Sequence, residues 1–396
     1  MKKLILISAI LFSFLYGNKI SAQINFEHTS WAEILAKAKT EHKLIFVDAY
    51  TSWCAPCKEM ANNVFTDEAV AKYYNASFVN AKINMEVGEG KDLAKLYSIL
   101  AYPTFLFIDE NRELLHKGVG LITSAEFIQL GKDAQLPEKQ FVHLEKKYKR
   151  GVRDVTFMIM YLNALDGASL DIKEPLNAYF ETQKEQDWAS RSNWNIIYTH
   201  LKDPQSKVFN YMVKHEADYA EKYTADSVNN KIFDVYSHAC GYSILSNEAD
   251  SAKYFQLREE IKKSGFLRSE EIILRSDMSF YEKNKDYENY AKAAIPYIEK
   301  YSDNEQMSRS VRVFYLGLKD TLMLAKADEW IKKCCDLSPD PGGWLYAFAS
   351  YLSQHGKKQE AVKFQRQAIE LIKADPKTPY MHWIPGMEKS IVEWSK

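Results

Sequence analysis

The chain has 396 residues, of which 46% are hydrophobic and 13% aromatic, enough for two or more domains with packed cores. Its 52 basic and 53 acidic residues leave a formal net charge of −1, which argues against a nucleic acid or an anionic membrane as partner. The 15 glycines and 11 prolines are few for this length, which favours helix over a large all-β domain.

The first 22 residues have the layout of a secretory signal peptide. Lys2-Lys3 form a basic start, residues 4–16 are an apolar run, and small residues follow at Ser21-Ala22. The run is about 13 residues long, whereas a spanning helix needs about 20, so we expect cleavage near Ala22 rather than a membrane anchor. We therefore expect the mature chain to work in the periplasm or otherwise outside the cytoplasm, where disulfides persist.

Residues 24–136 alternate between helix and strand patterns. Capping boxes at Ser30 and Thr123 open the first and last helices, because serine or threonine followed three residues later by glutamate satisfies free N–H groups. Continuous apolar runs at 44–50 and 104–108 predict central strands covered on both faces. The elements between and after them are helices ending near 64, at 69–74 and at 91–97, and strands at 78–84 and 113–120. This order predicts an α/β domain with a mixed sheet and helices on both faces.

The motif Trp53-Cys54-Ala55-Pro56-Cys57-Lys58 follows the first strand. At a strand-to-helix junction the helix N-terminus points N–H groups at the first sulfur, which stabilises a thiolate and makes Cys54 the nucleophile. Cys57 lies one helical turn later, close enough to displace a substrate sulfur. The spacing also suits half a zinc site, but the sequence has no second CxxC and no paired histidine spacing nearby. A four-residue loop stabilises little, so the motif predicts a redox-active disulfide that needs neither metal nor cofactor.

Several separate motifs in this order resemble the thioredoxin-fold family, in particular its secreted or periplasmic members. They are Val47-Asp48, the Trp53 to Lys58 motif, Val79-Asn80-Ala81-Lys82-Ile83, Tyr102-Pro103-Thr104, and Gly118 to Gly120 with the helix that follows. The resemblance covers residues 24 to about 135. Two positions depart from it. Tyr50 stands where a tryptophan near the active site is common, and Ala55 replaces the glycine of thioredoxins proper.

The resemblance implies roles for residues around the cysteines. Asp48 would be the buried carboxylate behind Cys57 that takes or gives a proton through water, and Lys82 would tune its pKa. The alternatives are that Asp48 is a strand-end aspartate wetted by the loop and Lys82 an exposed strand lysine. Pro103 is expected to lie beside the sulfurs if its peptide bond is cis. The predicted substrate groove is lined by Trp53, Pro56, Tyr102 and Pro103, although an aromatic is more often core.

The predicted reaction is thiol–disulfide exchange, in which Cys54 attacks a substrate disulfide and Cys57 resolves the mixed disulfide. Ala55-Pro56 and the pair of Asp48 and Lys82 resemble the reducing branch of the family. We therefore expect an extracytoplasmic thiol–disulfide oxidoreductase that reduces protein disulfides. The alternatives are a disulfide isomerase, or a non-catalytic repeat-based binding protein whose thioredoxin-like domain is structural.

Residues 138–396 show helical patterns throughout. The best-formed unit pairs 344–352 with 360–368 around Gly356, and resembles a tetratricopeptide-type helical hairpin. Weaker copies are marked by the alanines Ala252, Ala291, Ala327 and Ala361. We therefore predict a signal peptide at 1–22, a thioredoxin-like domain at 24–136 and an all-α domain at 138–396. The all-α domain is expected to recruit or orient a protein partner.

Three of the five cysteines lie in this helical region, at Cys240, Cys334 and Cys335. A bridge between the two adjacent ones would be strained by disulfide geometry. We expect core or half-buried thiols, with a disulfide from Cys240 to one of the other two as the alternative.

Overall fold

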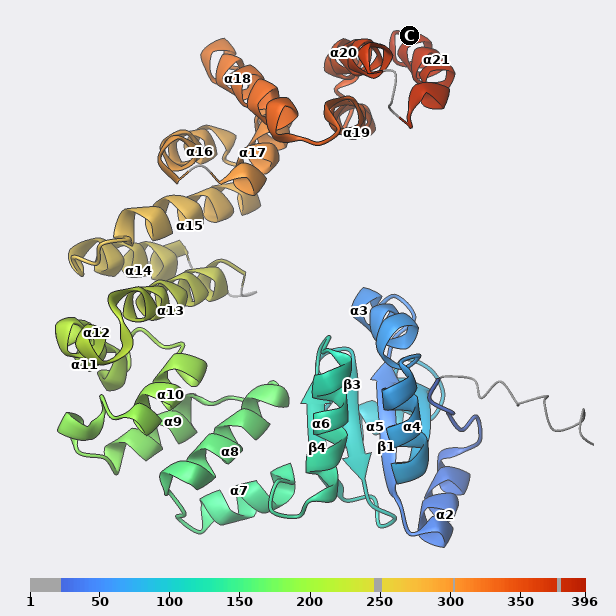
Figure 1. Cartoon of the computed structure of the whole chain (residues 1–396), viewed down its shortest axis with the longest axis vertical. Helices are drawn as coiled ribbons and strands as arrows, with labels where there is room; N and C mark the ends of the chain where they lie inside the picture. Colours follow the sequence, from blue (N-terminus) through green and yellow to red (C-terminus); the bar gives the residue numbers. More distant parts are fainter. Residues whose placement is uncertain (1–22, 246–250, 302, 376–378) are drawn as a thin grey trace, which may run out of the picture. The chain divides into compact units, whose positions relative to one another are not determined.

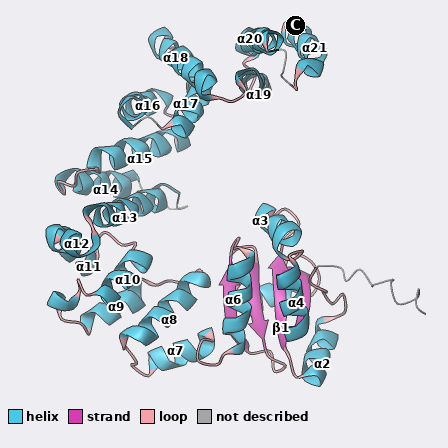
Figure 2. Cartoon of the chain, in the orientation of Figure 1, coloured by secondary structure: helices cyan, strands magenta, loops and turns pink. Residues whose placement is uncertain are grey.

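The structure is a computed structural model that describes residues 23–245, 251–301, 303–375 and 379–396 (Figure 1). The predicted signal peptide at 1–22 lies outside the described residues. The chain divides into two compact units, Met1–Leu201 and Lys202–Lys396. Every strand in the described ranges belongs to the first unit (Figure 2). The boundary predicted after residue 136 separates the sheet from the helices that directly follow it, and both lie within the first compact unit. This boundary stays a prediction.

A four-stranded sheet lies at the centre of the first unit. Its strands are β1 (Leu44–Tyr50), β2 (Phe78–Asn84), β3 (Thr104–Ile108) and β4 (Leu114–Val119). β1 pairs in parallel with β2 and antiparallel with β3, and β3 pairs antiparallel with β4, so the order is β2-β1-β3-β4. The predicted mixed sheet is therefore confirmed, with the two most apolar strands at its centre.

Helices cover both faces of the sheet, as predicted. They are α2 (Trp31–Glu41) and α5 (Gly90–Leu96) on one face, and α4 (Glu68–Ser77) and α6 (Ser124–Gln135) on the other. Side chains of β1 alternate between the faces, so Val47 joins the core under α2 and α5 while Phe46 lies under α4 and α6. The Phe46 ring centroid is 4.9 Å from that of Tyr74 on α4 and 5.4 Å from that of Phe127 on α6.

Short-range sequence signals set the helix ends around the site. Ser30 and Thr123 each form the predicted capping box. The helix that carries the CxxC motif runs as α3 (Ala55–Glu59) and continues as the π-helix η1 (Met60–Val64), so it ends where the sequence predicts. Its start is fixed close to the carboxyl end of β1, which brings the cysteines to one edge of the sheet.

Helices beyond residue 136 continue the first unit. They are α7 (Phe141–Lys149), α8 (Val155–Gly167), α9 (Lys173–Glu181), the 3₁₀ turn η2 (Glu185–Asp187) and α10 (Arg191–His200). Both α7 and α8 contact the edge strand β4. The Phe141 N–H donates a hydrogen bond to Nδ1 of His116 on β4 at 3.2 Å. The edge of the sheet at β4 is therefore covered by helix rather than left open for strand pairing.

The second unit is built from helices, many of them packed in sequential pairs. They are α11 (Lys207–Lys214), α12 (Glu216–Tyr223), α13 (Ala225–Leu245), α14 (Ser251–Lys263), α15 (Ser269–Lys283), α16 (Tyr287–Tyr301), α17 (Asn304–Gly317), α18 (Thr321–Leu337), α19 (Pro341–Gln354), α20 (Lys358–Ala374), the 3₁₀ turn η3 (Met381–Trp383) and α21 (Ile384–Trp394). The predicted hairpin is formed by α19 and α20. None of the helices in the described ranges is long and apolar enough to cross a membrane.

The alanine markers of the predicted repeats have different surroundings. Ala291, Ala327 and Ala361 are fully buried, whereas Ala252 is exposed. Small buried residues let paired helices approach closely, which suits stacked hairpins at three of the four positions. The paired helices are established, and the tetratricopeptide assignment stays a prediction.

The three cysteines of the helical region are free thiols, as expected from their setting. Cys240 and Cys334 are buried and Cys335 is half-buried, and no disulfide joins them. Burial raises the pKa of each thiol to about 11. Such thiols are protonated at neutral pH and are poor nucleophiles.

Candidate active site

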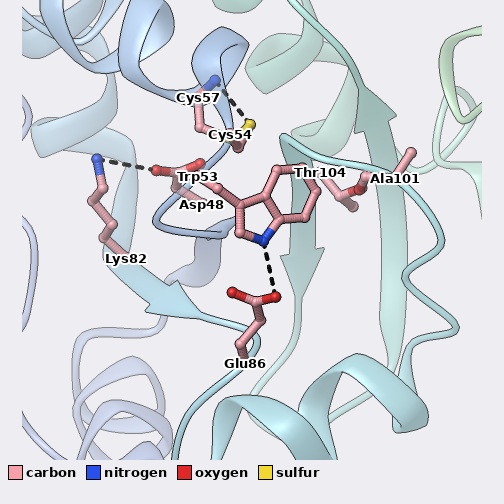
Figure 3. Close-up of a disulfide and its surroundings, with 8 residues drawn as sticks. All are labelled: Asp48, Trp53, Cys54, Cys57, Lys82, Glu86, Ala101 and Thr104. Carbon is pink, nitrogen blue, oxygen red and sulfur yellow. Dashed lines mark hydrogen bonds and ion pairs between the residues drawn. A yellow bond between two sulfur atoms is a disulfide. The ribbon is translucent and has the colours of Figure 1, made fainter.

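Cys54 and Cys57 form a disulfide where α3 begins (Figure 3). Cys54 is the N-cap residue of α3, and its sulfur accepts a hydrogen bond from the Cys57 N–H at 3.1 Å. Ala55 and Pro56 fill the first turn, where proline costs no hydrogen bond because the N–H there has no partner within the helix. Both cysteines are nearly buried, at 2% and 3% exposed, whereas Trp53 beside them is 66% exposed. A macromolecule that approaches the disulfide therefore meets Trp53 as well.

Asp48 lies on β1 with 1% of its surface exposed. Its register partner on β2 is Lys82, whose Nζ lies 3.4 Å from Oδ2 of the carboxylate (Figure 3). Burial raises the pKa of Asp48 to about 6, and the Lys82 charge opposes this rise. A carboxyl with a pKa near neutrality can take and give a proton at physiological pH. Asp48 is thus buried rather than wetted and Lys82 is paired, while their catalytic roles stay predictions.

The residues predicted to line the groove come from two segments, the start of α3 with Trp53 before it and the loop before β3. The Tyr102-Pro103 peptide bond is cis, and Pro103 is buried while Tyr102 is half-buried. The ring of Trp53 packs edge-to-face on that of Tyr102, with centroids 6.1 Å apart. Pro56 is exposed on the surface of α3. The structure therefore brings Tyr102 against Trp53, the residue that directly precedes Cys54.

Glu86 was not predicted from the sequence as a residue of the site. Its Oε1 accepts a hydrogen bond from Nε1 of Trp53 at 2.9 Å (Figure 3). The Glu86 N–H donates in turn to Oδ1 of Asn84, at the end of β2. An acidic residue after a strand carries no signal that it will reach an indole 33 positions earlier. The hydrogen bond fixes the orientation of the exposed Trp53 ring.

Two hydrogen bonds hold the loop before β3 in place. The Thr104 hydroxyl donates to the carbonyl oxygen of Ala101 at 2.7 Å, and the Gly120 N–H donates to the carbonyl oxygen of Pro103 at 2.9 Å. These bonds tie both ends of the Tyr102-Pro103 turn to the sheet.

Among the described residues, no group of three or more His, Cys, Asp or Glu side chains is arranged to hold a metal ion.

Comparison with known proteins assigns this part of the chain to a family. The thioredoxin family model matches residues 22–131. Thioredoxin H4 of Arabidopsis thaliana is 39% identical over 95 residues, which are 24% of this chain and 75% of the relative. Thioredoxin-1 of Drosophila melanogaster is 38% identical over 74 residues, and those residues are 19% of this chain and 64% of the relative.

Two further matches come from bacteria. The thiol:disulfide interchange protein DsbD of Actinobacillus pleuropneumoniae is 32% identical over 119 residues, covering 28% of this chain and 20% of that protein. The solution structure of a proposed disulphide-isomerase from Bacteroides thetaiotaomicron is 43% identical, with 29% of this chain and 95% of that one covered and a TM-score of 0.28. The family model falls on the sheet domain, which a long helical region follows. The chain belongs to the thioredoxin family.

Proposed function

We propose that this protein is a thiol–disulfide oxidoreductase that reduces disulfides in other proteins. The observation that carries the proposal is the Cys54–Cys57 disulfide at the start of α3, with the buried Asp48 and its partner Lys82 on the strands beside it. Family membership supports the same chemistry, since the matched relatives include thioredoxins and a thiol:disulfide interchange protein.

The reaction starts from the reduced dithiol. The Cys54 thiolate attacks one sulfur of a substrate disulfide, forms a mixed disulfide and releases the other substrate sulfur as a thiolate. Asp48 takes the proton of the Cys57 thiol, and the Cys57 thiolate then attacks Cys54. The second substrate thiolate leaves and takes a proton from water, while Asp48 returns its proton to solvent. Two electrons pass from the dithiol to the substrate, so each turnover needs a dithiol donor to reduce the Cys54–Cys57 disulfide again.

The trapping experiment uses Cys57→Ser in the full chain. Without the second thiol the mixed disulfide on Cys54 is not resolved, so a covalent adduct with a disulfide-containing protein should accumulate. Cys54→Ser is the matched control and should trap nothing, and Cys240→Ser should behave like the wild type because that thiol is buried. Failure of Cys57→Ser to trap any adduct, together with no reduction of insulin by the wild type, would favour a non-catalytic binding protein.

The direction of exchange follows from the reduction potential of the cysteine pair. Equilibration of the full chain with glutathione buffers measures it directly. We expect a potential closer to that of thioredoxin, at about −270 mV, than to that of a strong oxidant such as DsbA, at about −120 mV. Rescue of a scrambled substrate without net reduction would instead identify an isomerase.

We also propose that the protein is exported and acts outside the cytoplasm. The support is the signal-peptide pattern of residues 1–22 and the use of disulfide chemistry. The N-terminal sequence of the protein recovered from an extracytoplasmic fraction should begin near Gln23. Recovery of the chain in the cytoplasm with its first residues intact would contradict the proposal.

The helical region is proposed to bind a protein partner through tetratricopeptide-like hairpins. The paired helices of the second unit, such as α19 with α20, support this role. A chain that ends at Leu201 keeps the first compact unit whole. It should reduce insulin at the wild-type rate but capture fewer partners through the Cys57→Ser trap in cells. Equal capture of the same partners by both lengths would contradict the role.

A further inference from the structure

The ammonium group of Lys82 lies close to three aromatic rings. Its Nζ lies 5.1 Å from the ring centroid of Tyr50, 5.5 Å from that of Phe65 and 5.7 Å from that of Phe26. All three distances are within the range at which a cation is attracted to a ring face. The same Nζ is 3.4 Å from Oδ2 of Asp48, so one cation contacts three rings and one carboxylate.

The three rings come from three separate segments of the first unit. Tyr50 ends β1, and Phe65 follows η1 and is 2% exposed. Phe26 belongs to the segment before α2, which runs beside β2. The Glu27 N–H donates to the carbonyl oxygen of Asn80 at 2.8 Å, and the Ile24 N–H donates to that of Phe65 at 2.9 Å. Phe26 is therefore held in place by backbone hydrogen bonds on both sides of it.

We propose that Phe26, Tyr50 and Phe65 are positioning residues that hold the Lys82 ammonium beside Asp48, so that the carboxylate stays ready to accept the Cys57 proton. This inference rests on the proposed function, because it concerns the proton transfer of that reaction. The three residues act through Lys82 and are not themselves catalytic.

Phe26, Tyr50 and Phe65, called the aromatic cage below, matter because the lysine is partly exposed. The Lys82 side chain is 26% exposed, and a flexible four-carbon stem lets an exposed ammonium swing into water. Among the described residues, Lys82 is the one cation within ion-pair distance of Asp48, and neither carboxylate oxygen accepts a hydrogen bond of ordinary length. The ionised state of the buried carboxylate therefore depends on one mobile cation. Contact with the three rings would restrict that cation to positions near Asp48.

The Lys82 side chain is partly open to solvent, and carboxylates near its strand could compete for its charge. A cavity of about 300 Å³ is lined by Lys82 together with His28, Trp31 and Asn84 and with the acidic residues Glu27 and Glu89. Of these two carboxylates, Glu27 is paired with Lys37 at 2.5 Å, and Glu89 accepts a hydrogen bond from the Trp31 N–H at 3.0 Å. Both are thus engaged elsewhere and compete little with Asp48 for Lys82. The exposed His28 is the remaining titratable group that lines this cavity.

The test measures the ionisation of Asp48 directly in the full chain with an intact disulfide. Carboxyl ¹³C NMR of aspartate-labelled protein follows the Asp48 signal with pH, and Asp48→Asn assigns it. In Phe26→Leu and Tyr50→Leu we expect the midpoint to rise by about one pH unit, because an opposite charge 4 to 6 Å away lowers a carboxyl pKa by about that much or more. Lys82→Met sets the size of the complete effect.

Matched variants separate positioning from loss of packing. Tyr50→Phe keeps the ring and should titrate like the wild type. Phe78→Leu removes a ring from the same aromatic core, where Phe78 packs on Tyr74 and Phe107 and does not contact Lys82, so it should leave the midpoint unchanged. An Asp48 midpoint that is the same in wild type, Phe26→Leu and Tyr50→Leu would overturn the inference.

A second measurement separates this inference from the proposed function. The rate at which a preformed mixed disulfide on Cys54 is resolved, followed against pH, should shift to higher pH in Phe26→Leu by the same amount as the NMR midpoint. A wild-type chain that resolves no mixed disulfide would refute the proposed function, and the NMR titration would still decide whether the rings position Lys82. Resolution with an unshifted pH profile in both leucine variants would overturn the inference alone.

Discussion

We predict that the contact between His116 and α7 weakens in acid and that the first unit loses stability with it. His116 is 5% exposed on β4, and its Nδ1 accepts the Phe141 N–H at 3.2 Å. Burial lowers the pKa of His116 from 6.5 to about 4, and the nearby Asp133 opposes the shift only partly. A protonated ring would carry a hydrogen on Nδ1 and could no longer accept this hydrogen bond. Acidification should therefore loosen α7 from the sheet.

The size of the effect follows from the difference between the folded and unfolded pKa. Because the folded-state pKa is lowered, the unfolded chain binds a proton first, and stability is full above about pH 6.5 and falls as the pH drops towards 4. Between about pH 7.5 and pH 4.5, a shift of this size removes about 2.5 kcal/mol from the free energy of unfolding. Most of that loss lies between about pH 6 and pH 4.5.

The matched variant is His116→Asn, whose side-chain oxygen can take the place of Nδ1 as acceptor but does not titrate. Urea unfolding of both proteins at the two pH values gives the change in free energy, and the wild type should lose about 2.5 kcal/mol more than the variant. Other groups such as Asp48 contribute equally to both and cancel. His28→Gln, at an exposed histidine, should behave like the wild type. Equal pH dependence of wild type and His116→Asn would refute the reasoning.

Three further predictions concern the same unit. Asp48→Asn should raise the free energy of unfolding by about 2–3 kcal/mol at pH 8 and little at pH 4, because a folded-state pKa raised to about 6 makes the ionised carboxylate costly only at higher pH. Urea titrations at both pH values check this, and a gain that does not depend on pH would contradict it. Gly90→Ala should lower the free energy of unfolding by about 2 kcal/mol or more, because a Cβ there would lie 2.0 Å from the Asn84 carbonyl oxygen. It should also change Trp53 fluorescence, since Glu86, which bonds the Trp53 indole, follows Asn84 closely. An unchanged urea midpoint would count against this prediction. A chain that ends at residue 136 should melt at a lower temperature than one that ends at Leu201, because it lacks the helices over β4; equal melting temperatures in calorimetry would show that these helices add nothing.

Much of the fold follows from short-range patterns in the sequence. The capping boxes at Ser30 and Thr123, the apolar strand runs and the CxxC motif each depend on residues within a few positions of one another. Helix starts and strand periods arise from local hydrogen bonds and side-chain alternation, so they are visible in the sequence alone. The order of these elements was sufficient to predict a mixed sheet with helices on both faces.

The pairing of Asp48 with Lys82 could not be predicted from local sequence patterns alone. Asp48 stands out as a carboxylate within an apolar run, but its burial and its register with Lys82 depend on how β1 pairs with β2. A shift of one residue in that register would turn the lysine to the other face of the sheet. The resemblance to a known family supplied the register that the residues by themselves left open.

Only the tertiary structure decided the contacts that join distant segments. They are the hydrogen bond from Trp53 to Glu86, the cage of Phe26 and two further rings around Lys82, and the bond from Phe141 to His116. It also decided that the first compact unit extends to Leu201. Such contacts depend on which surfaces meet when the chain packs, and packing is set by side-chain shape and volume summed over many residues rather than by any local period. The sequence by itself therefore determined the elements and the chemistry at Cys54 and Cys57, while packing determined what surrounds them.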